Sequence, residues 1–326
     1  MEEKSTTIII KSSLNTFFYS YHSFSSIASL LLLPVSASIL FSQALTSSPS
    51  SPFLLLTISS RIQSLFHAAG FPSSSSSSPI FSFLNTKFSE TAFSFVFAFP
   101  SSITFLVLAK SSVVLTIFEF PRHKFSPPPL SSLLRIFRPV STTYFATCLL
   151  FISINAATFA FLFLAFSFVD VLHLSSNTSA FGLSVFGSII YSVILGISVV
   201  ICNLAIIVSA VENSSGFQSI LKSCMIIRKR ISTSLILALF ANLLMASVEA
   251  LFQYRVVRPY YLNRKLNLAL VGEGFSIIFM HSIVIVLDVI LSCLFYKSCK
   301  SGTSSNWDRY DHRMELEAEE KSDFQV

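Results

Sequence analysis

The stretch SVVICNLAIIVSAVENSSGFQSILKSCMIIRKRISTSLILAL, from Ser198 to Leu239, contains two hydrophobic segments on either side of a polar, partly basic region. The first hydrophobic segment ends near Ala210, and the second starts near Ser232. Between them, residues 212–216 are polar and predict a turn. This order predicts a membrane span, a short helix on the membrane surface and a second membrane span.

The region between the two spans predicts an amphipathic helix. Its apolar residues recur mostly at the i, i+3, i+4 and i+7 spacing of one helical face. They are Phe217, Ile220, Leu221, Cys224, Met225, Ile227 and Ile231. Residues 228–230 are all cations, which suit both the negative end of the helix dipole and anionic lipid head groups. The alternative is that these cations only set the orientation of the neighbouring spans.

The composition of the whole chain is that of a membrane protein. Of its 326 residues, 52 % are hydrophobic and only 12 % are charged, whereas soluble domains are about 25 % charged. The mean hydropathy is +0.71. We therefore predict an all-α, polytopic integral membrane protein. The net charge of +6 is spread over loops without an aromatic-interleaved basic patch, so no nucleic-acid partner is expected.

The hydrophobic segments divide the chain into three parts. Residues 1–23 predict an N-terminal interfacial segment, residues 24–296 a six-span membrane domain, and residues 297–326 a disordered, acidic cytoplasmic tail. The predicted spans are 24–45, 92–118, 142–168, 181–210, 232–252 and 270–296. Residues 52–66 are apolar but include Arg61, so they predict an interfacial helix; a re-entrant or spanning helix is the alternative.

The distribution of Lys and Arg predicts that both termini lie in the cytoplasm. The predicted inside loops 119–141 and 211–231 carry four such cations each, whereas the predicted outside loop 169–180 carries none. The loop 253–269 also carries four, although six spans place it outside. A glycosylation sequon begins at Asn177 in the outside loop, so Asn177 is the candidate glycosylation site.

Four polar residues inside predicted spans lie at similar depths, counted from the cytoplasmic ends of the helices. They are Lys110, Asn203, Asn242 and Asp288. An ionisable residue at mid-bilayer costs about 2.5–3.5 kcal/mol on insertion scales, so such residues should face the bundle and find partners. We predict one intramembrane polar layer in the cytoplasmic half, with Lys110 and Asp288 as its ion pair.

A second pair of polar residues follows from the same counting. Glu249 lies seven residues beyond Asn242, and His281 lies seven residues before Asp288. If the fifth and sixth spans are antiparallel neighbours, Glu249 is level with His281. The pair predicts either ordinary packing hydrogen bonds, worth about 0.6 kcal/mol each, or a site that handles protons or solutes.

The sequence lacks the common signatures of catalysis and metal binding. It has no glycine-rich phosphate loop, no histidine pair at metal-ligand spacing and no Gly-x-Ser-x-Gly elbow. We therefore predict no enzymatic activity, no cofactor and no metal. The chain has five cysteines, and none falls in a predicted outside loop, so no structural disulfide is expected.

Several short segments carry a family resemblance. They are residues 202–205 (CNLA), 208–212 (VSAVE), 216–217 (GF), 221–223 (LKS) and 294–300 (LFYKSCK). Together they resemble a plant family of uncharacterised six-span membrane proteins. The loop after the fourth span is also similar to that of bacterial YciC and glycerophosphodiesterase-associated membrane domains. The resemblance implies the fold and a membrane location but no activity or site residues, and the basic loop 253–269 departs from it.

These features favour a membrane protein that is not an enzyme. The first hypothesis is an organiser that interacts with membrane lipids, and with protein partners through loop 211–231 and the acidic tail. The alternative is a small-solute or proton transporter that uses the polar layer. An integral-membrane lipid enzyme has no supporting motif. The sequence places the protein in the plasma membrane or an endomembrane such as the endoplasmic reticulum, without deciding between them.

Overall fold

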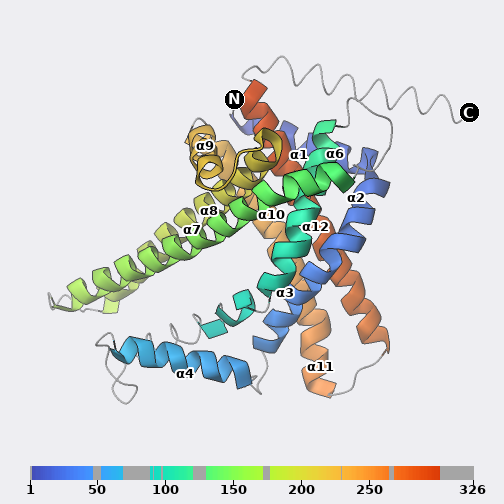
Figure 1. Ribbon diagram of the computed structural model, residues 1–326. Coiled ribbons are helices and arrows are strands. Elements are labelled where there is room, and N and C mark those ends of the chain that lie inside the picture. The colour runs from blue at the N-terminus through green and yellow to red at the C-terminus, as the bar shows by residue number, and fades with distance from the viewer. Residues whose placement is uncertain are drawn as a thin grey trace, which may run out of the picture. The chain divides into compact units, whose positions relative to one another are not determined.

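A computed structural model describes residues 2–46, 53–68, 89–90, 92–96, 98–119, 130–171, 177–228, 230–263 and 268–301. Nearly all of these residues are helical, and no strand occurs among them (Figure 1). Within this part of the chain, six helices are long and apolar enough to cross a membrane. They are Tyr21–Leu45, Ala98–Phe118, Ser132–Leu162, Val185–Glu212, Ile231–Leu262 and Leu268–Lys300. The predicted all-α, polytopic class is confirmed.

The described residues group into two compact units that share four helices. Unit 1 comprises Met1–Phe24, Lys110–Leu243 and Val286–Val326, and unit 2 comprises Ser25–Ala109 and Leu244–Ile285. The boundaries fall inside four elements, which are α2 (Tyr21–Ile27), α6 (Val107–Glu119), α10 (Ile231–Phe252) and α12 (Leu268–Ser301).

Unit 1 is built on two long helices that lie side by side. They are α7 (Leu130–Val171, 42 residues) and α8 (Asn177–Glu212, 36 residues), and the short helix α9 (Phe217–Arg228) packs against both (Figure 1). At 1.5 Å per residue, α7 and α8 measure about 63 Å and about 54 Å, well beyond a hydrocarbon core of about 30 Å. Both helices must therefore tilt or extend past the membrane.

The N-terminal part of unit 1 is also helical. Helix α1 (Glu2–Tyr19) and the start of α2 (Tyr21–Ile27) cover the predicted interfacial segment. Ile9 and Phe17 of α1 are buried, whereas Phe18 is largely exposed. This arrangement is that of an amphipathic helix with one face against its neighbours.

Unit 2 contains α3 (Leu33–Thr46), α4 (Phe53–Ala68) and the α10 and α12 portions assigned above. Its buried core consists of Leu40, Val248, Phe252, Val257, Ile277 and Ile278. The predicted interfacial segment 52–66 forms α4, a 16-residue helix that is not among the six candidate spans. The predicted tail beyond residue 301 lies outside the described residues.

Two wide helical turns in unit 2 come directly before prolines. The π-helical segments η1 (Ala28–Leu32) and η3 (Gln253–Val257) each end two residues before a proline, Pro34 and Pro259. Proline has no N–H to donate to the carbonyl four residues earlier, and its ring clashes with that carbonyl. A π turn widens the helix at this point, so the chain continues instead of breaking.

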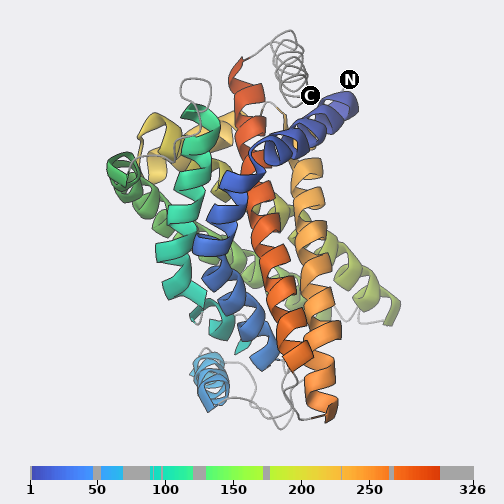
Figure 2. The same ribbon diagram turned by 90° about the vertical axis from the view of Figure 1, so that its right-hand side faces the viewer.

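The basic loop predicted at 253–269 is mostly helix in the structure. Segment η3 and helix α11 (Arg258–Asn263) continue α10 as one long orange helix in Figure 2. Arg255 and Arg258 therefore lie on a helical extension of the fifth span. The hydropathy of a window centred on the span does not reveal this extension, because cations lower the average without breaking the helix.

Candidate functional site

A chain of hydrogen bonds links three of the predicted intramembrane polar residues in unit 1. Lys110 Nζ on α6 donates to Asn203 Oδ1 on α8 at 2.8 Å. Asn203 Nδ2 in turn donates to Asp288 Oδ2 on α12 at 3.0 Å. The Lys110 side chain is nearly enclosed, at 9 % exposed. Each charge of this group thus has a hydrogen-bonding partner inside the membrane domain.

The structure differs from the predicted layer in two respects. Asn203 lies between Lys110 and Asp288, so the expected direct ion pair is replaced by a bridge through the Asn203 amide. Asn242 is exposed on α10 and does not join the group. Counting residues along a helix gives the depth of a side chain but not the direction in which it points, which explains why Asn242 was grouped with the others.

The bridging amide determines what this polar chain can do. Its oxygen accepts from the ammonium of Lys110, and its NH₂ donates to the carboxylate of Asp288, so both charges are compensated without contact between them. An amide has no proton that it exchanges readily, so Asn203 separates the two ionisable groups. The arrangement therefore joins three helices and holds opposite charges apart in a buried setting.

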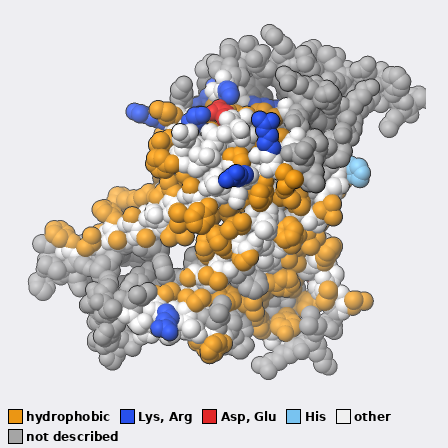
Figure 3. All heavy atoms as spheres, in the orientation of Figure 1, with side chains coloured by type: hydrophobic (Ala, Val, Ile, Leu, Met, Phe, Trp, Pro, Cys, Tyr) orange, Lys and Arg blue, Asp and Glu red, His pale blue; other side chains and the backbone are white. Residues whose placement is uncertain are grey.

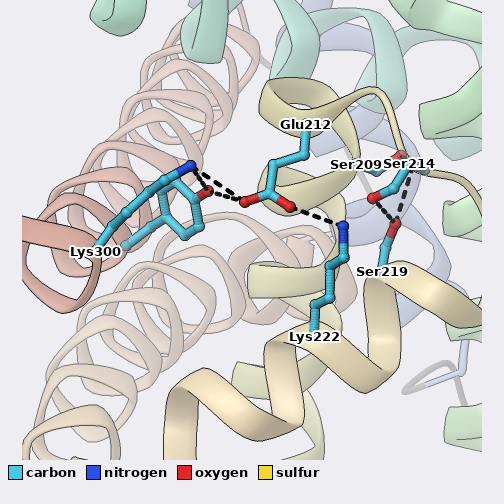
Figure 4. Close-up of polar contacts among 7 residues, drawn as sticks. Ser209, Glu212, Ser214, Ser219, Lys222 and Lys300 are labelled. Carbon is cyan, nitrogen blue, oxygen red and sulfur yellow. Dashed lines mark hydrogen bonds and ion pairs between the residues drawn. The ribbon is translucent and has the colours of Figure 1, made fainter.

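A second polar cluster forms the corner between α8 and α9 (Figure 4). Thr143 Oγ1 donates to Ser209 Oγ at 2.9 Å, and Ser209 Oγ donates to the Ser214 carbonyl at 2.7 Å. Ser219 Oγ also reaches the Ser214 carbonyl, at 3.0 Å, while the Gly216 N–H donates to Thr143 Oγ1 at 2.9 Å. The polar groups of the turn are therefore satisfied by side chains of α7, α8 and α9.

The backbone of the corner requires residues that tolerate the left-handed region. Asn213 has φ 51° and Gly216 has φ 63°. Asn and Gly are the residue types that adopt this region most readily, and they provide two left-handed positions within four residues. The predicted turn at 212–216 is thus confirmed.

Glu212, the last residue of α8, connects three helices of unit 1. Its carboxylate accepts from the Tyr296 hydroxyl of α12 at 2.7 Å, from Lys222 Nζ of α9 at 3.0 Å and from Lys300 Nζ at 3.2 Å (Figure 4). Lys300 Nζ also donates to the Tyr296 hydroxyl at 3.2 Å. The two lysines are about half exposed or more, so their pairs are weak, whereas the Tyr296 side chain is buried.

The central position of Glu212 was not predicted from the sequence, although Glu212 and Lys222 both lie in the segments that carry the family resemblance. Two other cations hold the same part of unit 1. Lys297 Nζ donates to the carbonyl of Ile117 at 3.0 Å, and Arg230 Nη1 donates to Ser298 Oγ at 3.1 Å. These contacts join the C-terminal end of α12 to α6 and to the start of α10.

Helix α9 exposes part of its predicted apolar face. Its buried residues are Ser219, Ile220, Ser223 and Ile227. By contrast, Phe217, Leu221 and Met225 are 65 %, 51 % and 74 % exposed. The single apolar face expected from the spacing is therefore divided. Small and β-branched residues pack against α8 and α7, and a ridge of large apolar residues points away from them.

Cys224 lies beside this ridge and is exposed. Partial burial raises the pKa of the Cys224 thiol above its ordinary value, so the side chain is neutral at physiological pH and behaves as a small apolar group. We call Phe217, Leu221, Cys224 and Met225 the apolar ridge of α9.

The predicted pair of Glu249 and His281 is confirmed as a spatial pair in unit 2. Glu249 Oε1 lies 3.9 Å from His281 Nε2. Asn177 begins α8, and its side chain lies outside the described residues. Among the described residues, no group of three or more His, Cys, Asp or Glu side chains is placed to hold a metal ion.

Comparison with known proteins gives a family but no activity. The model of a family described as a domain of unknown function (DUF8558) matches residues 2–323. No curated protein and no solved structure matches the chain.

Proposed function

Because the chain belongs to the DUF8558 family, whose description assigns no activity, we propose a function from the geometry of unit 1. We propose that the protein is a non-enzymatic, multi-pass membrane protein that binds anionic phospholipids along α9 and so organises lipid around itself. The proposal applies to the plasma membrane and to the endoplasmic reticulum alike, because the cytoplasmic leaflet of cell membranes contains anionic lipid.

The apolar ridge of α9 is the observation that carries this proposal. Phe217, Leu221 and Met225 are more than half exposed, although the opposite face of the same short helix is fully packed. Contiguous large apolar side chains on a surface helix mark a contact with a partner or a membrane. Because α9 directly follows a span, the nearest apolar phase is the acyl-chain boundary of the bilayer.

The charges on and near α9 favour anionic lipid over neutral lipid. Arg228 is exposed, and its side chain has no hydrogen bond or ion pair within the described part of the chain. Lys222 is 49 % exposed beside Glu212. Figure 3 shows Lys and Arg side chains around α9 and hydrophobic side chains over much of the α7–α8 pair. A cation near the surface of an anionic leaflet contributes about 1 kcal/mol.

The corner at Glu212 supplies the rigidity that lipid organisation requires. The α8–α9 turn is held by side-chain hydrogen bonds from Thr143, Ser209 and Ser219, and Lys222 ties the middle of α9 to Glu212. A helix held in this way presents its ridge in one orientation, so less conformational entropy is lost when lipid binds.

Serine substitution of the ridge tests the proposal. In the triple variant Phe217→Ser, Leu221→Ser, Met225→Ser, the apparent affinity for phosphatidylserine should fall about tenfold or more, since each large side chain loses an apolar contact. Native mass spectrometry of the protein released from nanodiscs with mixed phosphatidylcholine and phosphatidylserine would count the retained anionic lipids.

The matched control is Gln218→Ser, an exposed polar position on the same helix. It should retain anionic lipid like the unmodified protein. Equal retention by the triple variant and the control would refute the lipid-binding role of α9. If the triple variant loses phosphatidylcholine and phosphatidylserine to the same extent, α9 contacts lipid but does not prefer anionic head groups.

The buried polar chain of unit 1 favours a second candidate, a small-solute or proton transporter. Charged groups inside a membrane domain commonly line a pathway. A transporter should have water reaching Asp288, whereas an organiser should have a dry interior. A cysteine at buried Leu291, three residues beyond Asp288 on α12, distinguishes the two.

This cysteine would be introduced into a variant whose five native cysteines are serines. We expect Leu291→Cys to resist a membrane-impermeant maleimide, while Gln218→Cys, at an exposed polar position outside the ridge, reacts fully in the same background. If the cysteine at position 291 is modified at a rate comparable to the cysteine at position 218, water reaches the polar chain and the transporter is supported instead.

A further inference from the structure

The imidazole ring of His281 is enclosed in unit 2 without hydrogen-bonding partners. The residue is 1 % exposed. Neither Nδ1 nor Nε2 has a hydrogen-bonding partner among the described residues. A buried polar group left unpaired costs about 1–3 kcal/mol, more than the weak packing hydrogen bond expected at this depth. Such a group calls for a ligand that the protein side chains do not supply.

The carboxylate of Glu249 is the charged group that lies beside this ring. Its Oε1 is 3.9 Å from His281 Nε2, which is within ion-pair range but too long for a hydrogen bond. The Glu249 side chain is 31 % exposed, so it connects the enclosed ring to the exterior of unit 2. The pair thus consists of one exposed acid and one enclosed base.

Other ionisable groups on the neighbouring elements are remote from the ring along the chain. Helix α3, which contacts His281's neighbour Ser282 through Ser36, contains no ionisable residue. On the fifth span, the next ionisable residues after Glu249 are Tyr254 and Arg255, five and six positions away. On α12, Glu273 lies eight positions before His281, and Asp288 lies seven positions after it in unit 1. Glu249 is therefore the charge that faces the ring.

We propose that His281 and Glu249 form a reversible proton-binding site. A proton from solvent adds to the unprotonated ring nitrogen, no covalent bond between heavy atoms changes, and the product is an imidazolium beside a carboxylate. Both ring nitrogens are then donors. A shift of about 1 Å in the Glu249 side chain brings Oε1 to hydrogen-bonding distance of Nε2. Proton binding would tighten the contact between α10 and α12 within unit 2.

This inference does not depend on lipid binding by α9. The test is a titration over about pH 5 to pH 8, the range in which unperturbed imidazole side chains change charge. Ring ¹⁵N chemical shifts of ¹⁵N-histidine-labelled protein in nanodiscs would follow the titration. The chain has six histidines, so His281→Gln identifies the relevant signal by its loss.

Glu249→Gln tests the partner. An opposite charge within about 4–6 Å favours the charged form of a titrating group, so its removal should lower the midpoint by at least about one pH unit, a tenfold loss of proton affinity. Glu249→Asp keeps the charge and should retain most of the affinity. Glu273→Gln removes a carboxylate from α12 away from the ring and should leave the midpoint unchanged.

Two results would overturn the proposal. One is a His281 ring signal that does not move across the whole range in the unmodified protein, which requires no variant to fold. The other is an unchanged midpoint in Glu249→Gln, since proton binding would then be independent of the carboxylate.

Discussion

Replacing Asn203 by leucine is expected to lower the free energy of unfolding by about 3–5 kcal/mol, the loss typical when a buried charge is deprived of its partner. Leucine has the same branched arrangement of four side-chain heavy atoms but can neither accept from Lys110 nor donate to Asp288. Both charged groups would remain between helices without the amide that bridges them. Reversible unfolding in mixed micelles, followed by circular dichroism, would measure the change.

Asn155→Leu is a matched control for this experiment. Asn155 accepts a hydrogen bond from the Tyr191 hydroxyl at 2.8 Å, between α7 and α8, and no charge is involved. Its loss should cost only about 0.6 kcal/mol, the average for hydrogen bonds within membranes. If Asn203→Leu and Asn155→Leu lower the free energy of unfolding equally, the Asn203 bridge does not stabilise the buried charges.

Removing the charges as well should restore stability to the Asn203 variant. In the triple variant Lys110→Leu, Asn203→Leu, Asp288→Leu, no unpaired charge remains, so most of the loss should be recovered. The single changes Lys110→Leu and Asp288→Leu should each cost at least as much as the two together, because each leaves the other charge without its counter-charge. Simple additivity of the two changes would contradict the coupling seen in the structure.

Glu212→Leu is expected to produce the second large effect, about 2–4 kcal/mol of lost stability together with release of α9. The buried Tyr296 hydroxyl would lose its acceptor, which costs about 1–3 kcal/mol, and two partly exposed lysine pairs would add smaller amounts. Hydrogen–deuterium exchange of the α9 amides would report the release directly.

Two further variants separate the causes of this effect. Glu212→Gln keeps an acceptor for Tyr296 and removes only the charge, so it should cost about 1 kcal/mol. Arg228→Gln changes an exposed cation of α9 and should remain within about 0.5 kcal/mol of the unmodified protein. If Glu212→Leu leaves exchange in α9 as slow as Arg228→Gln does, then the serine corner alone positions the helix.

The features that could be predicted from the sequence are those that depend on residues close together in the chain. A span requires about 20 apolar residues because the hydrocarbon core has a fixed thickness, and helices satisfy their backbone hydrogen bonds internally. The six spans, the 212–216 turn and the existence of an amphipathic α9 follow from this local information. The depth of Lys110, Asn203 and Asp288 also follows, since each residue advances a helix by 1.5 Å.

Features that depend on the rotation of each helix about its axis required the tertiary structure. Depth counting grouped Asn242 with the polar layer, but packing turns this side chain outward and places Asn203 between the two charges. The apolar spacing of α9 predicted one buried face, yet Ile220 and Ile227 pack inward while Met225 remains exposed.

The sequence by itself determined the membrane class, the order of the helices and the depth of each polar residue, because bilayer thickness and helical rise act on neighbouring residues. Only the tertiary structure decided that Glu212 joins α8 to Lys222 and Tyr296, and that Asn203 lies between Lys110 and Asp288. The physical reason is that these contacts join helices far apart in the chain. Their formation depends on which faces pack together, and in an apolar span many faces are nearly equivalent in hydropathy.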